Sequence, residues 1–170
     1  VAGLKADKID YKGFIFIGLM NVGGDPYVIE YNVRMGDPET QVVLPRIKSD
    51  LVDLLKATAY GTLDDTDFEV DQDAATTVVM VAGGYPEAYE KGDSITGISQ
   101  VTNATVFHAG TKLGENGDIL TNGGRVIAVT GRGDSVAKAL ENSYTGIAKI
   151  SWKDEYHRTD IGQDILQLIN

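Results

Sequence analysis

Residues 14–34 read FIFIGLMNVGGDPYVIEYNVR. Two runs rich in β-branched and aromatic residues, at positions 14–20 and 27–34, enclose a segment with two glycines and an Asp-Pro pair. Glycine supplies positive φ angles, and aspartate and proline favour chain reversal, so the segment between the runs is predicted to be a turn. The stretch therefore predicts an antiparallel β-hairpin, and the unbroken apolar character of its first run is typical of a buried strand.

Polar side chains alternate with apolar ones along the second run of this hairpin. Because strand side chains point to opposite faces in turn, Glu30, Asn32 and Arg34 are predicted to share one face, and the apolar face is expected to pack on a core. A carboxylate and an amide oxygen two residues apart suit Mg²⁺, which proteins hold with few groups plus substrate phosphates. An arginine beyond them can neutralise charge on phosphoryl oxygens. Alternation alone also fits the commoner alternative, a half-exposed strand with a polar outer face.

Helices are predicted downstream of the hairpin. Asp37 with Pro38 is expected to begin a short helix, and Ser49 a second helix that ends near Gly61. The acidic residues 62–73 are expected to form a solvated connector.

The rest of the chain is predicted to be a small β-rich unit, sandwich-like or barrel-like, with a helix that covers it. Short strand-like runs separated by glycine turns lie at 76–82, 95–98, 105–108 and 125–130. A helical repeat of apolar residues follows a cap at Asp134. The fold class is therefore α+β, with a hairpin and helices followed by this β-rich unit.

Composition excludes several classes of function. The 170 residues carry 15 Lys and Arg against 25 Asp and Glu, a net charge of −10, which disfavours nucleic acid and anionic membrane surfaces as partners. The sequence has no cysteine and only two histidines, which removes thiolate zinc sites and nearly excludes a multi-histidine metal site. No apolar run is long enough to cross a bilayer and no signal peptide is visible, so a cytoplasmic location is expected.

A few residues outside the hairpin receive structural expectations. His108 is expected to hold a turn, and Arg158 and Asp160 to form an ion pair. Trp152 and Tyr156 are expected to be packing residues.

The longer run YVIEYNVRMGDPETQ, residues 27–41, resembles the end of the ATP-binding domain of ATP-grasp ligases. Within that superfamily, NVRMGDPETQ resembles the phosphoribosylamine–glycine ligase family, also called glycinamide ribonucleotide synthetase. Further landmarks of the C-terminal portion of that family follow in the same order, and the resemblance covers residues 12–162. They are KSDL at 48–51, AGGYP at 82–86, FHAGT at 107–111, TNGGRV at 121–126 and RTDIG at 158–162.

The resemblance implies a ligase of purine biosynthesis that joins glycine to 5-phosphoribosylamine through glycyl phosphate, with ATP cleaved to ADP and phosphate. Glu30 and Asn32 match the family's ligands for Mg²⁺ or Mn²⁺, and Arg34 would stabilise the transferred phosphoryl group. The substrate-binding positions that it implies are Asp37, Glu39, Thr40 and Gln41. One departure is that many ATP-grasp enzymes carry another acidic ligand roughly where Gly18 lies, and residues 14–20 hold no carboxylate.

The same resemblance implies three parts of the chain. Residues 1–47 would end an ATP-grasp domain, residues 48–73 would form a helix and connector, and residues 74–170 would form the C-terminal β-rich domain. Family members hold the nucleotide with lobes that precede this hairpin, and no Gly-rich phosphate loop followed by lysine occurs here. We therefore expect a C-terminal fragment that acts with the missing N-terminal lobes of the same polypeptide and is inactive alone. The alternative is a non-catalytic packing or interaction module that retains the fold.

Overall fold

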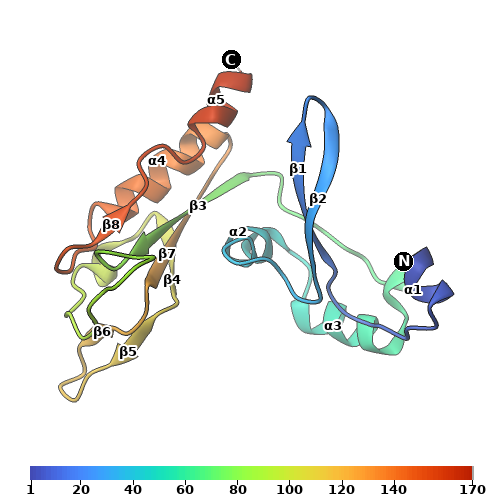
Figure 1. The fold of residues 1–170 in the computed structure, drawn as a ribbon, viewed down its shortest axis with the longest axis horizontal. Coiled ribbons are helices and arrows are strands. Elements are labelled where there is room, and N and C mark those ends of the chain that lie inside the picture. The colour runs from blue at the N-terminus through green and yellow to red at the C-terminus, as the bar shows by residue number, and fades with distance from the viewer. Residues whose placement is uncertain (170) are drawn as a thin grey trace. The chain divides into compact units, whose positions relative to one another are not determined.

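The computed structural model describes residues 1–169, which divide into two compact units (Figure 1). The first, here called the hairpin unit, comprises residues 1–40 and 47–71. The second, here called the sheet unit, comprises residues 41–46 and the chain from residue 72 onward.

The hairpin unit contains the predicted β-hairpin. Strand β1 (Phe16–Val22) pairs antiparallel with β2 (Asp25–Asn32), which confirms the prediction. The turn consists of Gly23 and Gly24, whose φ angles of 64° and 101° lie in the region that glycine adopts at no steric cost. The register shifts between Gly18 and Leu19, so β2 carries one extra residue, a β-bulge that the sequence did not predict.

The apolar side chains of the hairpin are exposed, so the prediction that they pack on a core is wrong. Ile17 on β1 is 47% exposed, and Tyr31 and Val33 of the second run are 69% and 73% exposed. The two strands form a sheet of their own. A two-stranded sheet cannot enclose a core by itself, and the described part of this unit adds only short helices and turns to it.

The helices of the hairpin unit are α1 (Ala2–Ala6) and α3 (Leu51–Tyr60), with a short 3₁₀ turn at Leu63–Asp65. Helix α3 ends at Gly61 as predicted, but it begins after Asp50 and not after Ser49. The Asp50 carboxylate accepts from the backbone N–H groups of Val52 and Asp53, at 2.8 and 3.2 Å. The Ser49 hydroxyl instead accepts from the Glu69 N–H at 2.8 Å, which joins the start of α3 to the segment around Glu69.

The short helix after the hairpin begins later than predicted. Helix α2 (Thr40–Val43) starts three residues beyond Asp37 and continues into a 3₁₀ turn, Leu44–Arg46. The segment 41–46 belongs to the sheet unit, where the Thr130 hydroxyl donates to the Gln41 carbonyl oxygen at 3.0 Å.

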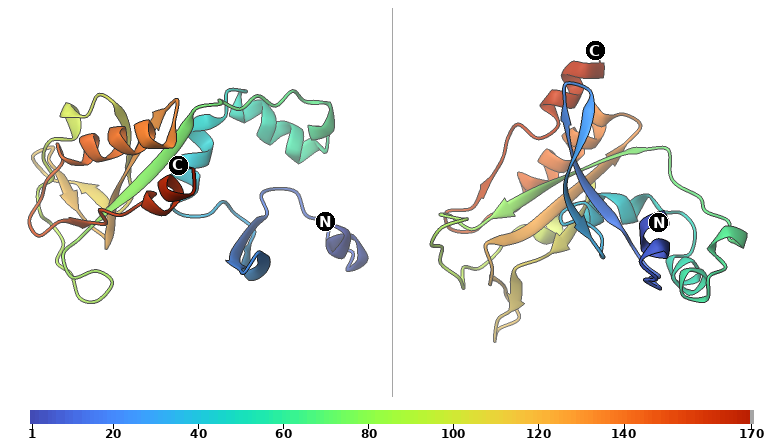
Figure 2. Two further views of the ribbon diagram at one scale, coloured as in Figure 1. Left: turned by 90° about the horizontal axis from the view of Figure 1, so that it is seen from above. Right: turned by 45° about the vertical axis from the view of Figure 1, so that its right-hand side comes forward.

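The sheet unit confirms the α+β class and the helix-covered β-rich unit. Its antiparallel sheet has the order β4-β7-β3-β8, and helix α4 (Val136–Ile147) packs along β7 and β3 (Figure 2). A separate two-stranded ribbon pairs β5 with β6, and helix α5 (Gln163–Ile169) follows the sheet. The strands are β3 (Ala74–Val81), β4 (Ala104–His108), β5 (Thr111–Leu113), β6 (Ile119–Thr121), β7 (Arg125–Gly133) and β8 (Tyr156–His157).

One predicted strand of this unit is wrong. Residues 95–98 form no ladder strand; Thr96 makes a single bridge to Ser151, and Ile98–Gln100 is a 3₁₀ turn. Gly97 has φ 82° and passes against the Lys149 carbonyl oxygen, so this segment is fixed by a close backbone approach and not by a ladder.

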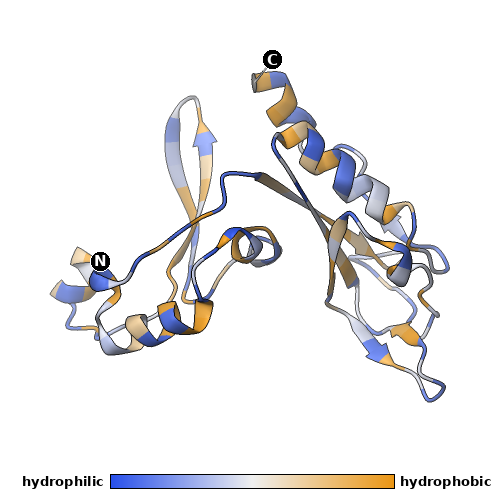
Figure 3. Ribbon diagram, turned by 180° about the vertical axis from the view of Figure 1, so that it is seen from behind, coloured by the Kyte–Doolittle hydropathy of each residue, from blue (hydrophilic) through white to orange (hydrophobic). Residues whose placement is uncertain are grey.

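The core of the sheet unit lies between the sheet and α4. Apolar side chains of β3 and β7, among them Met80 and Val129, pack with Ile147 of α4 and with Trp152, which is buried as predicted. Figure 3 shows polar and apolar residues alternating along α4, the pattern of a helix with one buried face. The fully buried Ser143 accepts from the Gly131 N–H at 2.9 Å and donates to the Thr76 carbonyl oxygen at 3.0 Å.

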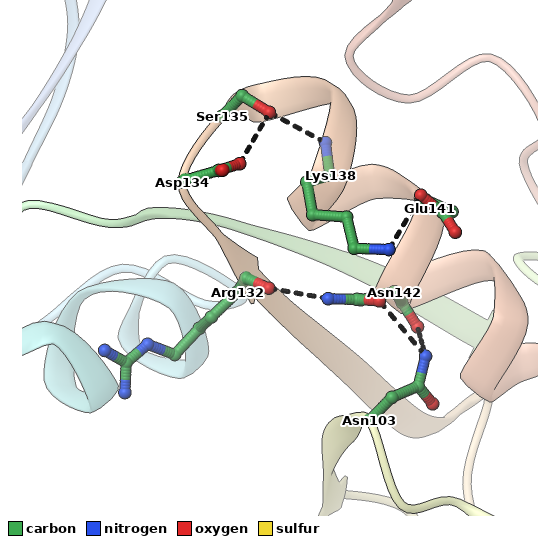
Figure 4. A network of polar contacts seen from close by, with 7 residues as sticks. All are labelled: Asn103, Arg132, Asp134, Ser135, Lys138, Glu141 and Asn142. Carbon is green, nitrogen blue, oxygen red and sulfur yellow. Dashed lines mark hydrogen bonds and ion pairs between the residues drawn. The ribbon is translucent and has the colours of Figure 1, made fainter.

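Polar contacts fix the start of α4 (Figure 4). Its N-cap is Ser135 and not the predicted Asp134: the Ser135 hydroxyl accepts from the Lys138 N–H at 3.3 Å and donates to Asp134 at 3.1 Å. The Asn142 side chain donates to the Arg132 carbonyl oxygen at 2.8 Å, so helix and strand β7 are joined beyond their apolar contacts.

Candidate functional site

The two predicted metal ligands lie in contact on strand β2. Glu30 and Asn32 project from the same face, and the Asn32 Nδ2 donates to Glu30 Oε1 at 2.8 Å. The strand alternates side chains by residue, so the two-residue spacing is what brings these groups together. The contact leaves the second carboxylate oxygen and the amide oxygen as acceptors.

The space beside this pair is made by a missing side chain. Gly18 of β1 is the cross-strand partner of Glu30. A Cβ on Gly18 would lie 3.1 Å from the Glu30 Cγ, so the Glu30 side chain lies where a side chain at position 18 would be.

The donor set of the pair fits Mg²⁺. A carboxylate and an amide oxygen are hard oxygen ligands, and Mg²⁺ is commonly held by one or two protein groups together with waters and substrate phosphates. Within residues 1–169 no group of three or more histidine, aspartate or glutamate side chains converges on a metal position. Glu30 and Asn32 therefore suit a metal shared with a phosphate-bearing ligand, not a closed protein cage.

Arg34 is separated from the pair by the end of the strand. Strand β2 ends at Asn32 and the chain bends at Val33 and Arg34, so the prediction that the strand runs through Arg34 is wrong. The Arg34 side chain is exposed, and its Nη1 donates to the Met35 carbonyl oxygen at 3.1 Å.

The predicted substrate-binding residues follow this bend. Asp37 and Glu39 are exposed, and Glu39 lies against the buried Gly36. The Thr40 hydroxyl and backbone N–H both bond to the Gly36 carbonyl oxygen, at 2.6 and 2.9 Å, which closes the turn. Gln41 belongs to the sheet unit.

A hollow of about 510 Å³ in the hairpin unit is lined by Asn32 but not by Glu30. Its lining is largely apolar and includes Leu4, Ile15, Ile17 and Tyr31. No motif pointed to this hollow in the sequence, because residues from α1 and from both strands meet only in the fold.

The other single-residue predictions have mixed outcomes. His108 Nδ1 lies 3.1 Å from the Thr111 hydroxyl, as expected of a turn-holding residue. The predicted pair of Arg158 and Asp160 is confirmed by two hydrogen bonds of 2.8 Å, and Arg158 lowers the pKa of Asp160. Tyr156 is 59% exposed, so its predicted packing role is wrong.

Sequence reasoning missed the role of Tyr144. Its hydroxyl donates to the Arg158 carbonyl oxygen at 2.9 Å and accepts from the Ile161 N–H at 3.2 Å. The pKa of Tyr144 is raised, mainly because its hydroxyl is partly buried. The hydroxyl thus joins α4 to the turn that carries Arg158 and Asp160.

The helices in the described part of the chain lack either the length or the apolar character that crossing a bilayer requires.

Comparison with protein families gives two matches in chain order. Residues 1–40 match the phosphoribosylglycinamide synthetase ATP-grasp (A) domain, and residues 75–164 match the phosphoribosylglycinamide synthetase C domain.

Individual relatives agree with these family matches. The chain is 51% identical, over 95% of its length, to 21% of the bifunctional purine biosynthetic protein PUR2,5 of Pichia angusta. It is 47% identical, over 98% of its length, to 40% of the phosphoribosylamine–glycine ligase of Chlorobaculum tepidum. The crystal structure of phosphoribosylamine–glycine ligase from Thermotoga maritima matches 94% of the chain and 39% of its own, with a TM-score of 0.80 and 34% identity. The chain thus spans about two fifths of the length of these two ligases.

Proposed function

The chain belongs to the phosphoribosylglycinamide synthetase family, and from that premise we propose that it is the C-terminal part of a ligase that joins glycine to 5-phosphoribosylamine. Its residues match the end of the ATP-grasp domain and the C domain in order. The proposed substrates, glycine and 5-phosphoribosylamine, are those for which its ligase relatives are named. The proposed setting is purine biosynthesis in the cytoplasm.

The proposed reaction has two steps. The γ-phosphoryl group of ATP passes to the glycine carboxylate, which gives glycyl phosphate and ADP. The amine of 5-phosphoribosylamine then attacks the glycyl carbonyl carbon and forms an amide bond. The bond from that carbon to the phosphate oxygen breaks, inorganic phosphate leaves with its electrons, and the amine gives up one proton to the phosphate or to solvent. Both steps develop charge on phosphoryl oxygens, which positive groups stabilise.

Glu30 and Asn32 are the proposed metal-binding pair. A bound Mg²⁺ or Mn²⁺ would supply positive charge to the ATP phosphates. The observation that supports the pair most directly is the 2.8 Å contact between the two side chains, because it holds two oxygen-bearing groups at one place on a strand. Strands position functional groups more exactly than loops do.

The residues after the strand would serve the substrates. Arg34 is exposed and always charged, so it is the proposed group that balances charge on the transferred phosphoryl group. The carboxylates of Asp37 and Glu39 are suited to an ammonium or amine, and Thr40 and Gln41 to polar groups of the substrates. The Thr40 hydroxyl is already donated to Gly36, so Thr40 would contribute by accepting a hydrogen bond.

The upstream part of the ATP-grasp domain is the proposed cover of the exposed hairpin. The ATP-grasp match ends in this chain at residue 40, and exposed apolar side chains lie on both strands. Contiguous exposed apolar surface commonly marks an interaction site. We expect the chain alone to be inactive, because in this proposal the upstream part also holds the nucleotide.

The test is ADP release with glycine, 5-phosphoribosylamine and Mg-ATP, assayed for this chain and for the complete polypeptide that contains it. No ADP release by the chain, together with glycine-dependent turnover by the complete polypeptide, would support the proposal. Turnover by the chain alone would contradict the need for the upstream lobes. No ADP release by either would favour the alternative, a non-catalytic interaction module that uses the exposed face of the hairpin.

A further inference from the structure

Gly18 lies directly across from Glu30, at the one irregular point of the hairpin. On one side of this pair Ile17 is opposite Tyr31, and on the other Leu19 is opposite Val28, so Ile29 is the extra residue of a bulge. Bulges bend a strand and re-aim a side chain, and they are frequent beside active sites. A glycine inside a strand often marks such a bulge or the close approach of another group.

The group that approaches Gly18 is the Glu30 side chain. A Cβ at position 18 would lie 3.1 Å from the Glu30 Cγ, whereas the Glu30 backbone nitrogen and oxygen would both be 3.7 Å away. The backbone distances are ordinary van der Waals contacts, but the side-chain distance is tighter than nine in ten real Cβ contacts. An added methyl group would therefore leave the ladder in place and displace the Glu30 side chain by a few tenths of an ångström.

We propose that Gly18 is a positioning residue for Glu30: its missing side chain lets Glu30 lie over β1 with its carboxylate held at Asn32. The proposal rests on the proposed function, in which Glu30 and Asn32 hold the metal. Because the carboxylate carbon is bonded to Cγ, a shift of Cγ moves the carboxylate relative to the Asn32 amide. Any side chain at position 18, a carboxylate included, would compete with Glu30 for this space.

The first measurement uses the 170-residue chain without metal. The Asn32 side-chain amide protons are observed by ¹H–¹⁵N NMR in the wild type, in Gly18→Ala and in Gly3→Ala. Gly3 is the matched control, because its φ is ordinary and a Cβ there would meet no atom within 4 Å. In Gly18→Ala we expect the hydrogen-bonded amide proton to move towards the position of a free asparagine, with the thermal midpoint unchanged. An unchanged Asn32 amide in Gly18→Ala would overturn the proposal.

The second measurement uses Mn²⁺ together with ATP as the probe, on the complete polypeptide, because the pair suits a metal shared with a phosphate-bearing ligand. Paramagnetic broadening of the Asn32 amide gives the Mn²⁺ affinity, and we expect Gly18→Ala to weaken it about tenfold, the order found when an outer residue that orients a ligand is lost. The variant Glu30→Gln distinguishes the metal-binding role of Glu30 from the positioning role of Gly18. If Glu30→Gln weakens Mn²⁺ binding and Gly18→Ala does not, only the role of Gly18 is wrong. If the wild type shows no broadening at Asn32, or Glu30→Gln leaves it unchanged, the metal pair is wrong and the role of Gly18 falls with it.

Discussion

The Asn32 side-chain amide donates to the Glu30 carboxylate at 2.8 Å, across one intervening residue of strand β2. Because Tyr31 points to the other face, nothing in the strand separates the two polar groups. A hydrogen bond between prospective metal ligands reduces the rotamer freedom that binding would otherwise remove. The pair is thus arranged before any ligand arrives, and its two members are expected to differ in what their loss does.

Replacing Glu30 by Gln in the complete polypeptide that contains the chain removes the charge of the pair and keeps its shape. We expect Mg²⁺-dependent turnover to fall by about two orders of magnitude or more, since loss of a ligand exceeds the roughly 10- to 100-fold effect of losing an outer partner. Steady-state kinetics against Mg²⁺ concentration measures this. Glu115→Gln, at an exposed position in the turn between β5 and β6, is the matched control. Near-normal turnover of Glu30→Gln with folded protein would exclude Glu30 as a metal ligand.

Asn32 offers a graded test at the neighbouring position. Asn32→Asp keeps an oxygen donor but loses the N–H that bonds to Glu30, and Asn32→Leu loses both. We therefore expect the apparent Mg²⁺ affinity to follow the order wild type, Asn32→Asp, Asn32→Leu, with a loss of about 10- to 100-fold for the leucine variant. Equal affinities for Asn32→Leu and the wild type would show that Asn32 contributes no metal contact.

The hairpin shows which structural features follow from local sequence and which do not. Gly23 and Gly24 between two β-prone runs predicted the strands and the turn, because turn geometry is a local property. The bulge was not predictable, since it depends on how Gly18 pairs with Glu30 across the ladder. Exposure of Ile17 was mispredicted because burial depends on what lies against the strand and not on the strand itself.

The exact first residue of a helix also depends on contacts that the local sequence does not reveal. Ser49 and Asp50 are both competent caps, as are Asp134 and Ser135. The Ser49 hydroxyl is engaged by Glu69, 20 residues along the chain, so Asp50 caps α3. At the start of α4, Asp134 accepts a hydrogen bond from the Ser135 hydroxyl, and that hydroxyl in turn caps the helix by accepting from the Lys138 N–H.

The buried hydroxyl of Ser143 is expected to contribute to the stability of the sheet unit. This hydroxyl is the hydrogen-bond acceptor for the Gly131 N–H and donates to the Thr76 carbonyl oxygen. Ser143→Ala removes this partner in the interior, and we expect the free energy of unfolding to fall by about 1–3 kcal/mol. Urea denaturation measures the change, with the exposed Ser99→Ala as control. A loss no greater than that of Ser99→Ala would mean that the site rearranges or admits water.

Arg158 and Asp160 predict a pH-dependent contribution to stability. The pKa of Asp160 is lowered from 3.8, first by its hydrogen bond with Arg158. A carboxyl group with a lowered folded-state pKa stabilises the fold above its unfolded pKa and loses that contribution as the pH falls through its folded pKa. We therefore expect Asp160→Asn to lower the thermal midpoint at neutral pH and to have less effect in strong acid. Thermal unfolding of both proteins across this range tests it; a difference independent of pH would assign the effect of Asp160 to packing.

The exposed hairpin predicts uneven protection from hydrogen exchange. In the chain alone, amides of β1 and β2 are expected to exchange well before those of β3 and β7, because the hairpin strands lack a buried layer while Met80 and Val129 lie in the core. Hydrogen–deuterium exchange with mass spectrometry resolves these segments. Addition of the proposed upstream part, produced separately, is expected to slow exchange in β1 and β2 and to leave β3 and β7 unchanged, since docking on the hairpin would cover Ile17 and Tyr31. If the upstream part restores glycine-dependent turnover without slowing exchange in the hairpin, the covering surface must lie elsewhere on the chain.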